Sequence, residues 1–440
     1  MRFTELSGGN GCSILSATPG PDLAAAGYDE TEYAVSGSVT GHSRAGPVDA
    51  AAFTTRVVVR RPLAAAAFNG TLVVEWHNVS SGVDAAPEYT YLAAELVRAG
   101  YAYAGVSAQY TGVVGGAGSV EIETGRGGPA DQDPERYGAL HHPGDAYCHD
   151  IFAAVGRALA ESGSDDAHPL AGLRVRHRIA VGESQSAMAL TTHVNEFAEV
   201  HGVFDGYLIH SRCAGALPLG EVGTGIDVSA AFDVPPTPIR DVGIPVLTVQ
   251  TETDILTNFR YHLARQPDTD RVRTWEVAGS AHADHVQIGP YEDYLGCPQP
   301  VNRGQVQFVL RAALSRLRGW VVGDATPPTA APLQLTAGGT GPAFVVDDIG
   351  NVCGGVRTPS VDAPTQVLSG VVAEPVSRIC LLFGSTLPVA ADILAARYGT
   401  RATYLERYRA AADRAIDAGF VLPADRDLLL ADAHPELVPE

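Results

Sequence analysis

The sequence predicts an α/β protein with a mostly parallel central sheet that helices cover on both faces. Apolar, β-favouring stretches alternate with helix-favouring stretches through most of the chain, and parallel strands need such crossover helices. Most of the β-favouring stretches are nearly continuous apolar runs, which is typical of strands buried on both faces. One of them, residues 179–183, leads through Gly-Glu-Ser-Gln-Ser directly into a helical run. These observations together indicate the fold class.

The individual elements follow from apolar periodicity and from glycine and proline breaks. The expected strands cover residues 32–39, 54–60, 72–77, 101–107, 179–183, 206–210, 246–251 and 272–277. The expected helices cover residues 88–98, 145–161, 185–199, 303–318, 390–398, 401–418 and 423–433. No helix separates the first two strands, so we expect an antiparallel edge there.

Changes in composition predict three parts. An N-terminal β extension covers residues 1–60, an α/β core covers 61–320, and a C-terminal segment packed on the core covers 321–440. Two insertions rich in glycine and other loop-forming residues, near 109–144 and 212–243, interrupt the core. Loops of that length are usually functional, and we interpret both as lid segments.

Composition and charge exclude several classes of function. The chain has 440 residues, is 45% hydrophobic and carries a net charge of −20. So acidic a protein suits neither nucleic acid nor an anionic membrane surface. No apolar stretch approaches the roughly 18 residues of a membrane span, and no signal peptide is apparent, so we expect a cytoplasmic protein. The chain contains no lysine, which excludes a Walker A lysine, a pyridoxal Schiff base and a serine–lysine dyad.

The cysteines are scattered along the chain without a Cys-x-x-Cys motif, and we expect most of them to be reduced and structural. They are Cys12, Cys148, Cys213, Cys297, Cys353 and Cys380. A bridge between Cys353 and Cys380 is the one pairing that we consider.

Ser184 is the candidate nucleophile, because the sequence around it is typical of a nucleophile elbow. Such a turn needs small residues two positions before and after the serine, and Gly182 and Ser186 occupy these positions. The following helix N-terminus favours negative charge. Ser186 is the rival nucleophile, but Met188 would then occupy a position that needs a small residue. The alternative without catalysis is that Ser184 only caps the helix.

A serine nucleophile needs a base and a carboxylate that orients the base. In proteins with this elbow, both follow the serine on loops after later strands. We assign His282 as the base and Asp254 as the acid, with Glu252 as the alternative acid and His285 as the rival base. A zinc cluster around His282 would need a histidine at position 280, which is serine, so we predict no metal.

Backbone amides must bind the negative charge that develops on the substrate. Gln185, directly after the nucleophile, should supply one amide. Val79, in the loop after the strand at 72–77, is the candidate for the second. Asn78 either contributes through its side chain or only allows the turn.

Five stretches, at 68–78, 137–145, 182–187, 250–254 and 348–359, resemble the α/β-hydrolase superfamily. Within it, they resemble the bacterial family of alpha/beta hydrolase domain-containing proteins. The resemblance implies the α/β-hydrolase fold with an integral C-terminal segment, and a serine hydrolase that uses Ser184, Asp254 and His282 without a cofactor. Tyr137 and His142, which lie in the second stretch, are candidate substrate-pocket residues, as is Asn78.

We therefore predict a serine esterase or lactonase that cleaves a small-molecule carboxylic ester or lactone through an acyl-enzyme. Amide hydrolysis and acyl transfer on the same triad remain alternatives. A non-catalytic binding protein that retains the fold is a third, since a fold does not prove an activity. The sequence is compatible with a homo-oligomer and does not identify the substrate.

Overall fold

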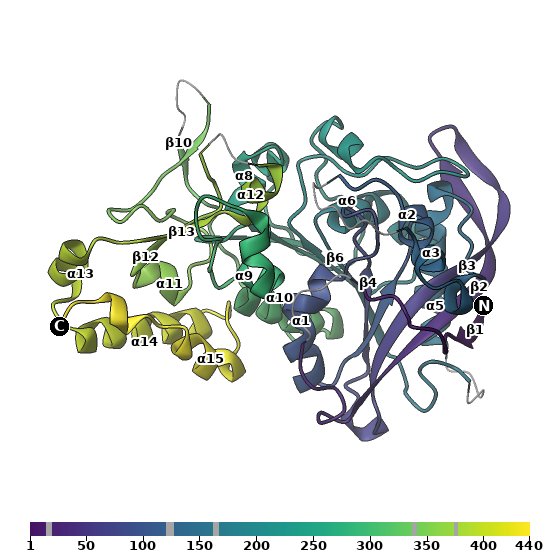
Figure 1. Ribbon diagram of the computed structural model, residues 1–440, viewed down its shortest axis with the longest axis horizontal. Coiled ribbons are helices and arrows are strands. Elements are labelled where there is room, and N and C mark those ends of the chain that lie inside the picture. Colours follow the sequence, from purple (N-terminus) through teal and green to yellow (C-terminus); the bar gives the residue numbers. More distant parts are fainter. Residues whose placement is uncertain (15–19, 120–126, 162–166, 337–340, 374–376) are drawn as a thin grey trace. The chain divides into compact units, whose positions relative to one another are not determined.

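The computed structural model describes residues 1–14, 20–119, 127–161, 167–336, 341–373 and 377–440 (Figure 1). The chain forms two compact units, Met1–Val246 and Leu247–Glu440. The predicted division into three parts stays a prediction. Part of the predicted insertion at 109–144, residues 120–126, lies outside the described residues.

The sheet of the first unit is parallel in its centre and antiparallel at its N-terminal edge. Its strands are β1 (Arg2–Glu5), β2 (Tyr28–Ser43), β3 (Gly46–Pro62), β4 (Thr71–Trp76), β5 (Ala102–Val106), β6 (His177–Glu183) and β7 (Gly206–His210). They follow the order β1-β2-β3-β5-β4-β6-β7. The pairs β1–β2, β2–β3 and β3–β5 are antiparallel, whereas β5–β4, β4–β6 and β6–β7 are parallel. The predicted fold class and its antiparallel edge are confirmed; β2 and β3 form the long purple hairpin of Figure 1.

The parallel register brings two loops to the same edge of the sheet. Val74 of β4 lies opposite Ala180 of β6, and Glu75 lies opposite Val181. All residues of β4 are buried, as the apolar run predicts. Because β4 and β6 run in the same direction, the loop after β4 and the turn after β6 leave the sheet side by side.

Helices flank this sheet. They are α1 (Pro87–Arg98), α2 (Tyr110–Val114), α3 (Pro129–Gln132), α4 (Pro134–Tyr137), α5 (Cys148–Ala160), α6 (Gln185–Thr192) and α7 (Ala198–His201). Short 3-10 turns are η1 (Ala65–Ala67), η2 (Asp145–Tyr147) and η4 (Val228–Phe232).

The predicted helix at 185–199 is not one continuous α-helix. A π-helical turn, η3 (His193–Phe197), separates α6 from α7. At this point the Leu217 amide donates to the Met188 carbonyl at 3.1 Å, and the Thr192 hydroxyl donates to the Leu217 carbonyl. Because the Leu217 amide bonds to the Met188 carbonyl, it disturbs the regular hydrogen bonds along the helix axis. This accounts for the widened, π-helical turn.

The second unit contains the remaining strands and helices. Its strands are β8 (Val246–Thr251), which begins at the last residue of the first unit, β9 (Val272–Val277), β10 (Leu335–Thr336), β11 (Ala343–Phe344), β12 (Gln366–Ser369) and β13 (Ser385–Pro388). Its helices are α8 (Glu252–Leu256), α9 (His285–Ile288), α10 (Val306–Val322), α11 (Pro359–Asp362), α12 (Arg378–Phe383), α13 (Ala391–Tyr398), α14 (Arg401–Asp417) and α15 (Arg426–Ala431). The 3-10 turns are η5 (Tyr261–Ala264), η6 (Gly289–Leu295), η7 (Pro423–Asp425) and η8 (Pro435–Leu437). Strands β8 and β9 are neighbours, β10 pairs with β11, and β12 pairs with β13.

Residues after 320 pack closely within this unit. Val356 forms a parallel bridge with Val277 at the end of β9. Phe308 of α10 packs against Ala412 and Leu429 of the C-terminal helices. These contacts make the C-terminal residues part of the same compact body as β9 and α10.

The structure corrects the predicted cysteine pairing. Cys380 forms its disulfide with Cys297, and the two Cα atoms are 5.5 Å apart. Cys353 is a free thiol, so the pairing of Cys353 with Cys380 is wrong. A bridge needs two Cα atoms within about 7 Å, which sequence spacing does not reveal. Among the described residues, no helix has the length and apolarity needed to cross a bilayer.

Glu75, on β4, is a fully buried carboxyl group. Its Oε2 accepts from the Tyr103 hydroxyl at 2.7 Å and from the Tyr89 amide at 2.9 Å, and its Oε1 accepts from the Glu88 amide at 3.1 Å. Burial raises the pKa of Glu75 to about 8, against the opposing effect of these hydrogen bonds. The folded protein therefore keeps this carboxyl group protonated at neutral pH.

We expect the Glu75→Gln variant to lose part of the pH dependence of stability. Between the ordinary pKa of 4.5 and the folded value of about 8, the unfolded chain releases a proton that the folded chain retains. The free energy of unfolding then falls as pH rises through this window, by on the order of 5 kcal/mol in total. Denaturant titrations from pH 4.5 to 8 should give a flatter profile for Glu75→Gln than for wild type. Glu135→Gln, at an exposed site, is the control, and parallel profiles for wild type and Glu75→Gln would contradict the assignment.

Candidate active site

Ser184 occupies a strained turn between β6 and α6. Its backbone has φ 61° and ψ −118°, a region that residues other than glycine rarely adopt. The Ser184 amide donates to the His210 carbonyl at 2.9 Å, and its carbonyl accepts from Met188 at 3.0 Å. The turn is therefore held from both sides, as expected for a nucleophile elbow.

The small residues that flank Ser184 have distinct roles. A Cβ atom on Gly182 would lie 3.0 Å from Ser186 Oγ and 3.1 Å from Leu190 Cδ1, so the turn leaves little room for a side chain. The Ser186 hydroxyl donates to the Glu183 carbonyl at 2.8 Å and accepts from the Glu183 amide at 3.0 Å. Ser186 thus braces the turn with a buried hydroxyl, which explains how serine can replace the usual glycine.

The loop after β4 is tied to this turn. Asn78 and Ala85 close the loop with two backbone hydrogen bonds of 2.9 and 2.8 Å. The Asn78 side chain donates from Nδ2 to the Glu183 carbonyl at 3.0 Å and accepts from the Ser80 amide at 2.8 Å. Both ends of this side-chain amide therefore hold the loop, whereas a contact with substrate stays a prediction.

The two amides predicted to bind the oxyanion differ in their surroundings. Gln185 begins α6, so its backbone N–H has no acceptor within the helix. The Val79 amide, by contrast, donates to the side-chain Oε1 of Gln185 at 3.1 Å. Val79 and Gln185 are both buried. The motif did not predict this hydrogen bond between the Val79 amide and the Gln185 side chain.

In the second unit, His282 and Asp254 form a hydrogen-bonded pair. His282 Nδ1 lies 2.7 Å from Asp254 Oδ1. The other carboxylate oxygen accepts from the Thr251 amide and hydroxyl, both at 2.7 Å, and Asp254 is completely buried. The His282 amide donates to the Thr253 hydroxyl at 3.1 Å. When Nδ1–H donates to Asp254, the other ring nitrogen is left in the form that accepts a proton.

Glu252, the alternative acid, binds backbone instead of imidazole. Its two oxygens accept from the amides of Gly279 at 2.6 Å and Gly370 at 2.9 Å. Burial raises the pKa of Glu252 to about 7. Gly279 has φ 68°, and a Cβ atom there would lie 2.5 Å from Val361 Cγ2. Glu252 therefore shapes the loop that carries His282.

The rival base lies in a different environment. His285 Nδ1 is 3.0 Å from Glu292 Oε2, and the His285 side chain is 42% exposed. The neighbouring Asp284 caps α9 through bonds from the amides of Val286 and Gln287. Across the part of the chain that the structure describes, no three or more His, Cys, Asp or Glu side chains form a group able to hold a metal ion.

Tyr137 and His142 make structural contacts. The Tyr137 hydroxyl donates to Glu32 at 2.8 Å and accepts from the Cys12 amide at 3.0 Å. His142 Nε2 lies 2.9 Å from the Ala108 carbonyl, and its Nδ1 accepts from the Gly144 amide at 3.2 Å. Burial lowers the pKa of His142 to about 4, so the ring is neutral at pH 7. Their role in a substrate pocket stays a prediction.

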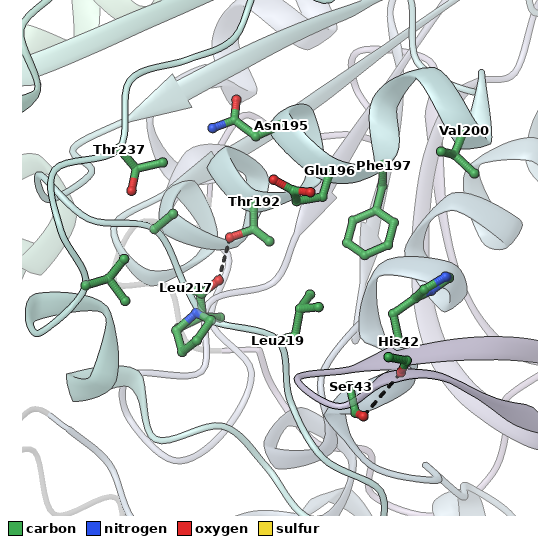
Figure 2. A pocket seen from close by; sticks show the side chains of 14 residues that line it. His42, Ser43, Thr192, Asn195, Glu196, Phe197, Val200, Leu217, Leu219 and Thr237 are labelled. Atoms are coloured by element: carbon green, nitrogen blue, oxygen red, sulfur yellow. Dashed lines mark hydrogen bonds between the residues drawn. The ribbon is translucent and has the colours of Figure 1, made fainter.

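A cavity of about 490 Å³ lies elsewhere in the first unit (Figure 2). It lies between the turn of the β2–β3 hairpin, the π-helical turn and residues 216–219, and none of the three predicted pocket residues lines it. Thr192, on its wall, is eight residues beyond Ser184, or about 12 Å along the helix axis. The cavity therefore lies toward the end of α6 opposite the candidate nucleophile, and the sequence did not predict it.

Comparison with known proteins gives one family model and several solved structures to which this chain is similar. A family model described as alpha/beta hydrolase domain matches residues 4–431. A putative dienelactone hydrolase from Klebsiella pneumoniae is 14% identical, with a TM-score of 0.32, and covers 66% of this chain and 98% of its own. One of two fungal esterases from Rhizomucor miehei is 11% identical, with a TM-score of 0.34 and coverage of 68% and 87%.

Est1E from Butyrivibrio proteoclasticus is also 11% identical, with a TM-score of 0.29 and coverage of 64% and 99%. No curated protein matches the sequence. The family model spans nearly the whole chain and accords with the mixed sheet and the turn at Ser184. The protein therefore belongs to the alpha/beta hydrolase domain family, as the resemblance in sequence predicted.

Proposed function

We propose that the protein hydrolyses a small carboxylic ester or lactone through an acyl-enzyme. Ser184 is the nucleophile, His282 the general base and Asp254 the acid that orients it. The observation that carries this proposal is the positive φ of Ser184 at a strand-to-helix turn, because such strain is stored where a nucleophile must be exposed. Family membership and the 2.7 Å contact between His282 and Asp254 support it.

In the proposed reaction, Ser184 Oγ attacks the carbonyl carbon while His282 Nε2 takes the hydroxyl proton. Asp254 stabilises the imidazolium that forms. The backbone amide of Gln185 donates to the new oxyanion. The tetrahedral intermediate expels the alcohol, which receives the proton from His282, and the acyl group remains on Ser184. In a lactone the alcohol stays attached to the acyl chain.

Water then completes the cycle. It attacks the acyl-enzyme as His282 takes one of its protons. The second tetrahedral intermediate then expels Ser184 Oγ, which receives that proton from His282, and releases the carboxylic acid. A lactone yields a hydroxy acid. Each step uses only side chains and amides of this chain, and no cofactor is involved.

The test combines substrate profiling with covalent labelling. The purified protein is assayed with p-nitrophenyl esters of increasing acyl length, aliphatic lactones and the matching anilides, with and without an added alcohol. We expect turnover of esters or lactones and fluorophosphonate labelling that peptide mapping places on Ser184. Faster cleavage of anilides would make the protein an amidase, and dominant ester exchange would make it an acyltransferase. Absence of both turnover and labelling would leave a non-catalytic binding protein.

A further inference from the structure

The side-chain carboxamide of Gln185 accepts a hydrogen bond from the Val79 backbone amide, which the sequence predicts to bind the oxyanion. The Val79 N–H donates to Gln185 Oε1 at 3.1 Å, and no part of the Gln185 side chain reaches solvent. The same residue thus offers one oxyanion donor through its backbone and covers the other with its side chain. An amide has a single hydrogen, so Val79 cannot serve both acceptors fully.

A chain of buried side chains holds the carboxamide in place. Gln185 Nε2 donates to Gln109 Oε1, which also accepts from Trp76 Nε1 at 3.0 Å. Gln109 Nε2 in turn donates to Asp145 Oδ2 at 3.4 Å. All four side chains are buried.

Asp145 connects this series of hydrogen-bonded side chains to the predicted insertion at 212–243. The Asp145 carboxylate accepts from the Ile226 amide at 2.8 Å and from the Tyr110 amide at 2.6 Å. The Asp145 amide donates to the Thr224 carbonyl at 2.9 Å. The carboxamide that covers Val79 is therefore linked, through two side chains, to a segment far along the sequence.

We propose that Gln185 is a gate on the oxyanion hole. In the resting protein, its carboxamide accepts the hydrogen bond of the Val79 amide. When negative charge develops on the substrate carbonyl, this bond breaks and the Val79 amide donates to the substrate. This inference rests on the proposed function. A hydrogen bond to an ionised acceptor is roughly twice as strong as one to a neutral acceptor, so the oxyanion can displace the carboxamide. The terminal torsion of a glutamine is broad, so a partial rotation suffices.

The gate has a physical purpose when no substrate is bound. A buried amide without an acceptor is unfavourable, because the hydrogen bond that it loses from water is not replaced. Gln185 removes this penalty at Val79. Substrate in its ground state offers only a neutral carbonyl oxygen, which has no advantage over the carboxamide. The donor therefore becomes available mainly in the transition state, where binding accelerates the reaction.

Two substitutions of Gln185, by side chains of similar length, distinguish a gate from a residue that only supports the structure. Gln185→Met removes the competing acceptor. Gln185→Glu replaces it with a carboxyl group that is the stronger acceptor once it is ionised, so all affinities are compared at pH 9, above the pKa of about 8 that burial gives Glu75. The probe is an alkyl boronic acid, whose boron bonds to the serine oxygen as the proton passes to His282, leaving a tetrahedral anion. We expect Gln185→Met to bind it about fivefold more tightly, or about 1 kcal/mol, and Gln185→Glu to bind it at least tenfold more weakly. For esters, kcat should follow the same order while KM changes little.

The controls keep the outcomes distinct. Gln132→Met alters a carboxamide that donates to the nearby Gly127 carbonyl, and it should leave boronic acid affinity unchanged. If Gln185→Met does not fold, Gln185→Ala replaces it, with thermal unfolding as the check. Weaker binding by both the Met and Glu variants, or no change in either, would overturn the gate. If the wild type binds no boronic acid and is not labelled on Ser184, the proposed function itself fails.

Discussion

Replacement of Ser184 by alanine should lower kcat by on the order of 10⁵ or more, because the acyl-enzyme cannot form without the serine oxygen. Alanine fits the turn no worse than serine, since both carry a Cβ at the same strained φ of 61°. The variant should therefore fold, and circular dichroism with thermal unfolding should give curves close to wild type. The measurement is kcat on the best ester or lactone, together with loss of fluorophosphonate labelling.

Ser186→Ala is the matched control, because it removes a hydroxyl two residues away. Among the residues that the structure describes, that hydroxyl bonds to the Glu183 amide and carbonyl. We expect a loss of about 1–2 kcal/mol in stability, with labelling still on Ser184. A labelled, active Ser184→Ala together with an unlabelled Ser186→Ala would move the nucleophile to the second serine.

Asp254→Asn should reduce kcat by about 10⁴, as the corresponding change does in other triads. The asparagine side chain can donate to Nδ1 of His282, which moves the ring proton to Nε2. The ring then cannot accept the serine proton, although its position changes little. Steady-state kinetics on the same substrate checks the prediction, and the stability curve shows whether the cap on the Thr251 amide survives.

The Glu252→Gln variant tests whether Asp254 or Glu252 is the acid that orients His282. Glu252 accepts from the amides of Gly279 and Gly370, so one amide loses its acceptor when an NH₂ group replaces an oxygen. The cost in stability should be about 1–3 kcal/mol, while kcat stays within about tenfold of wild type. If Glu252→Gln is inactive and Asp254→Asn is active, the assignment of the acid is reversed.

Local sequence patterns predicted the elements around the site closely. The apolar run before Gly182 became β6, the serine after it took the strained turn, and the helix began at Gln185, as the motif requires. Each of these features depends on a few neighbouring residues, because backbone preference and turn geometry are local properties. The same holds for the buried strand before His77.

The same local patterns did not predict contacts between residues that are far apart in the sequence. Cys380 lies near Cys297 and not near Cys353 because of how the chain folds between them. The break in the helix after Thr192 arises from Leu217, which comes from a distant insertion. In each case the deciding partner is far along the chain, and its approach depends on packing that no local pattern records.

By itself, the sequence determined the fold class and the strand-turn-helix at Ser184, and it placed the candidate acid and base after the candidate nucleophile. Only the tertiary structure decided that Asp254, and not Glu252, contacts His282, and that the side chain of Gln185 covers Val79. The residues of that last contact are 106 positions apart. The register of β4 beside β6 brings them together, and register depends on pairing across the sheet, whereas a turn depends on its own few residues.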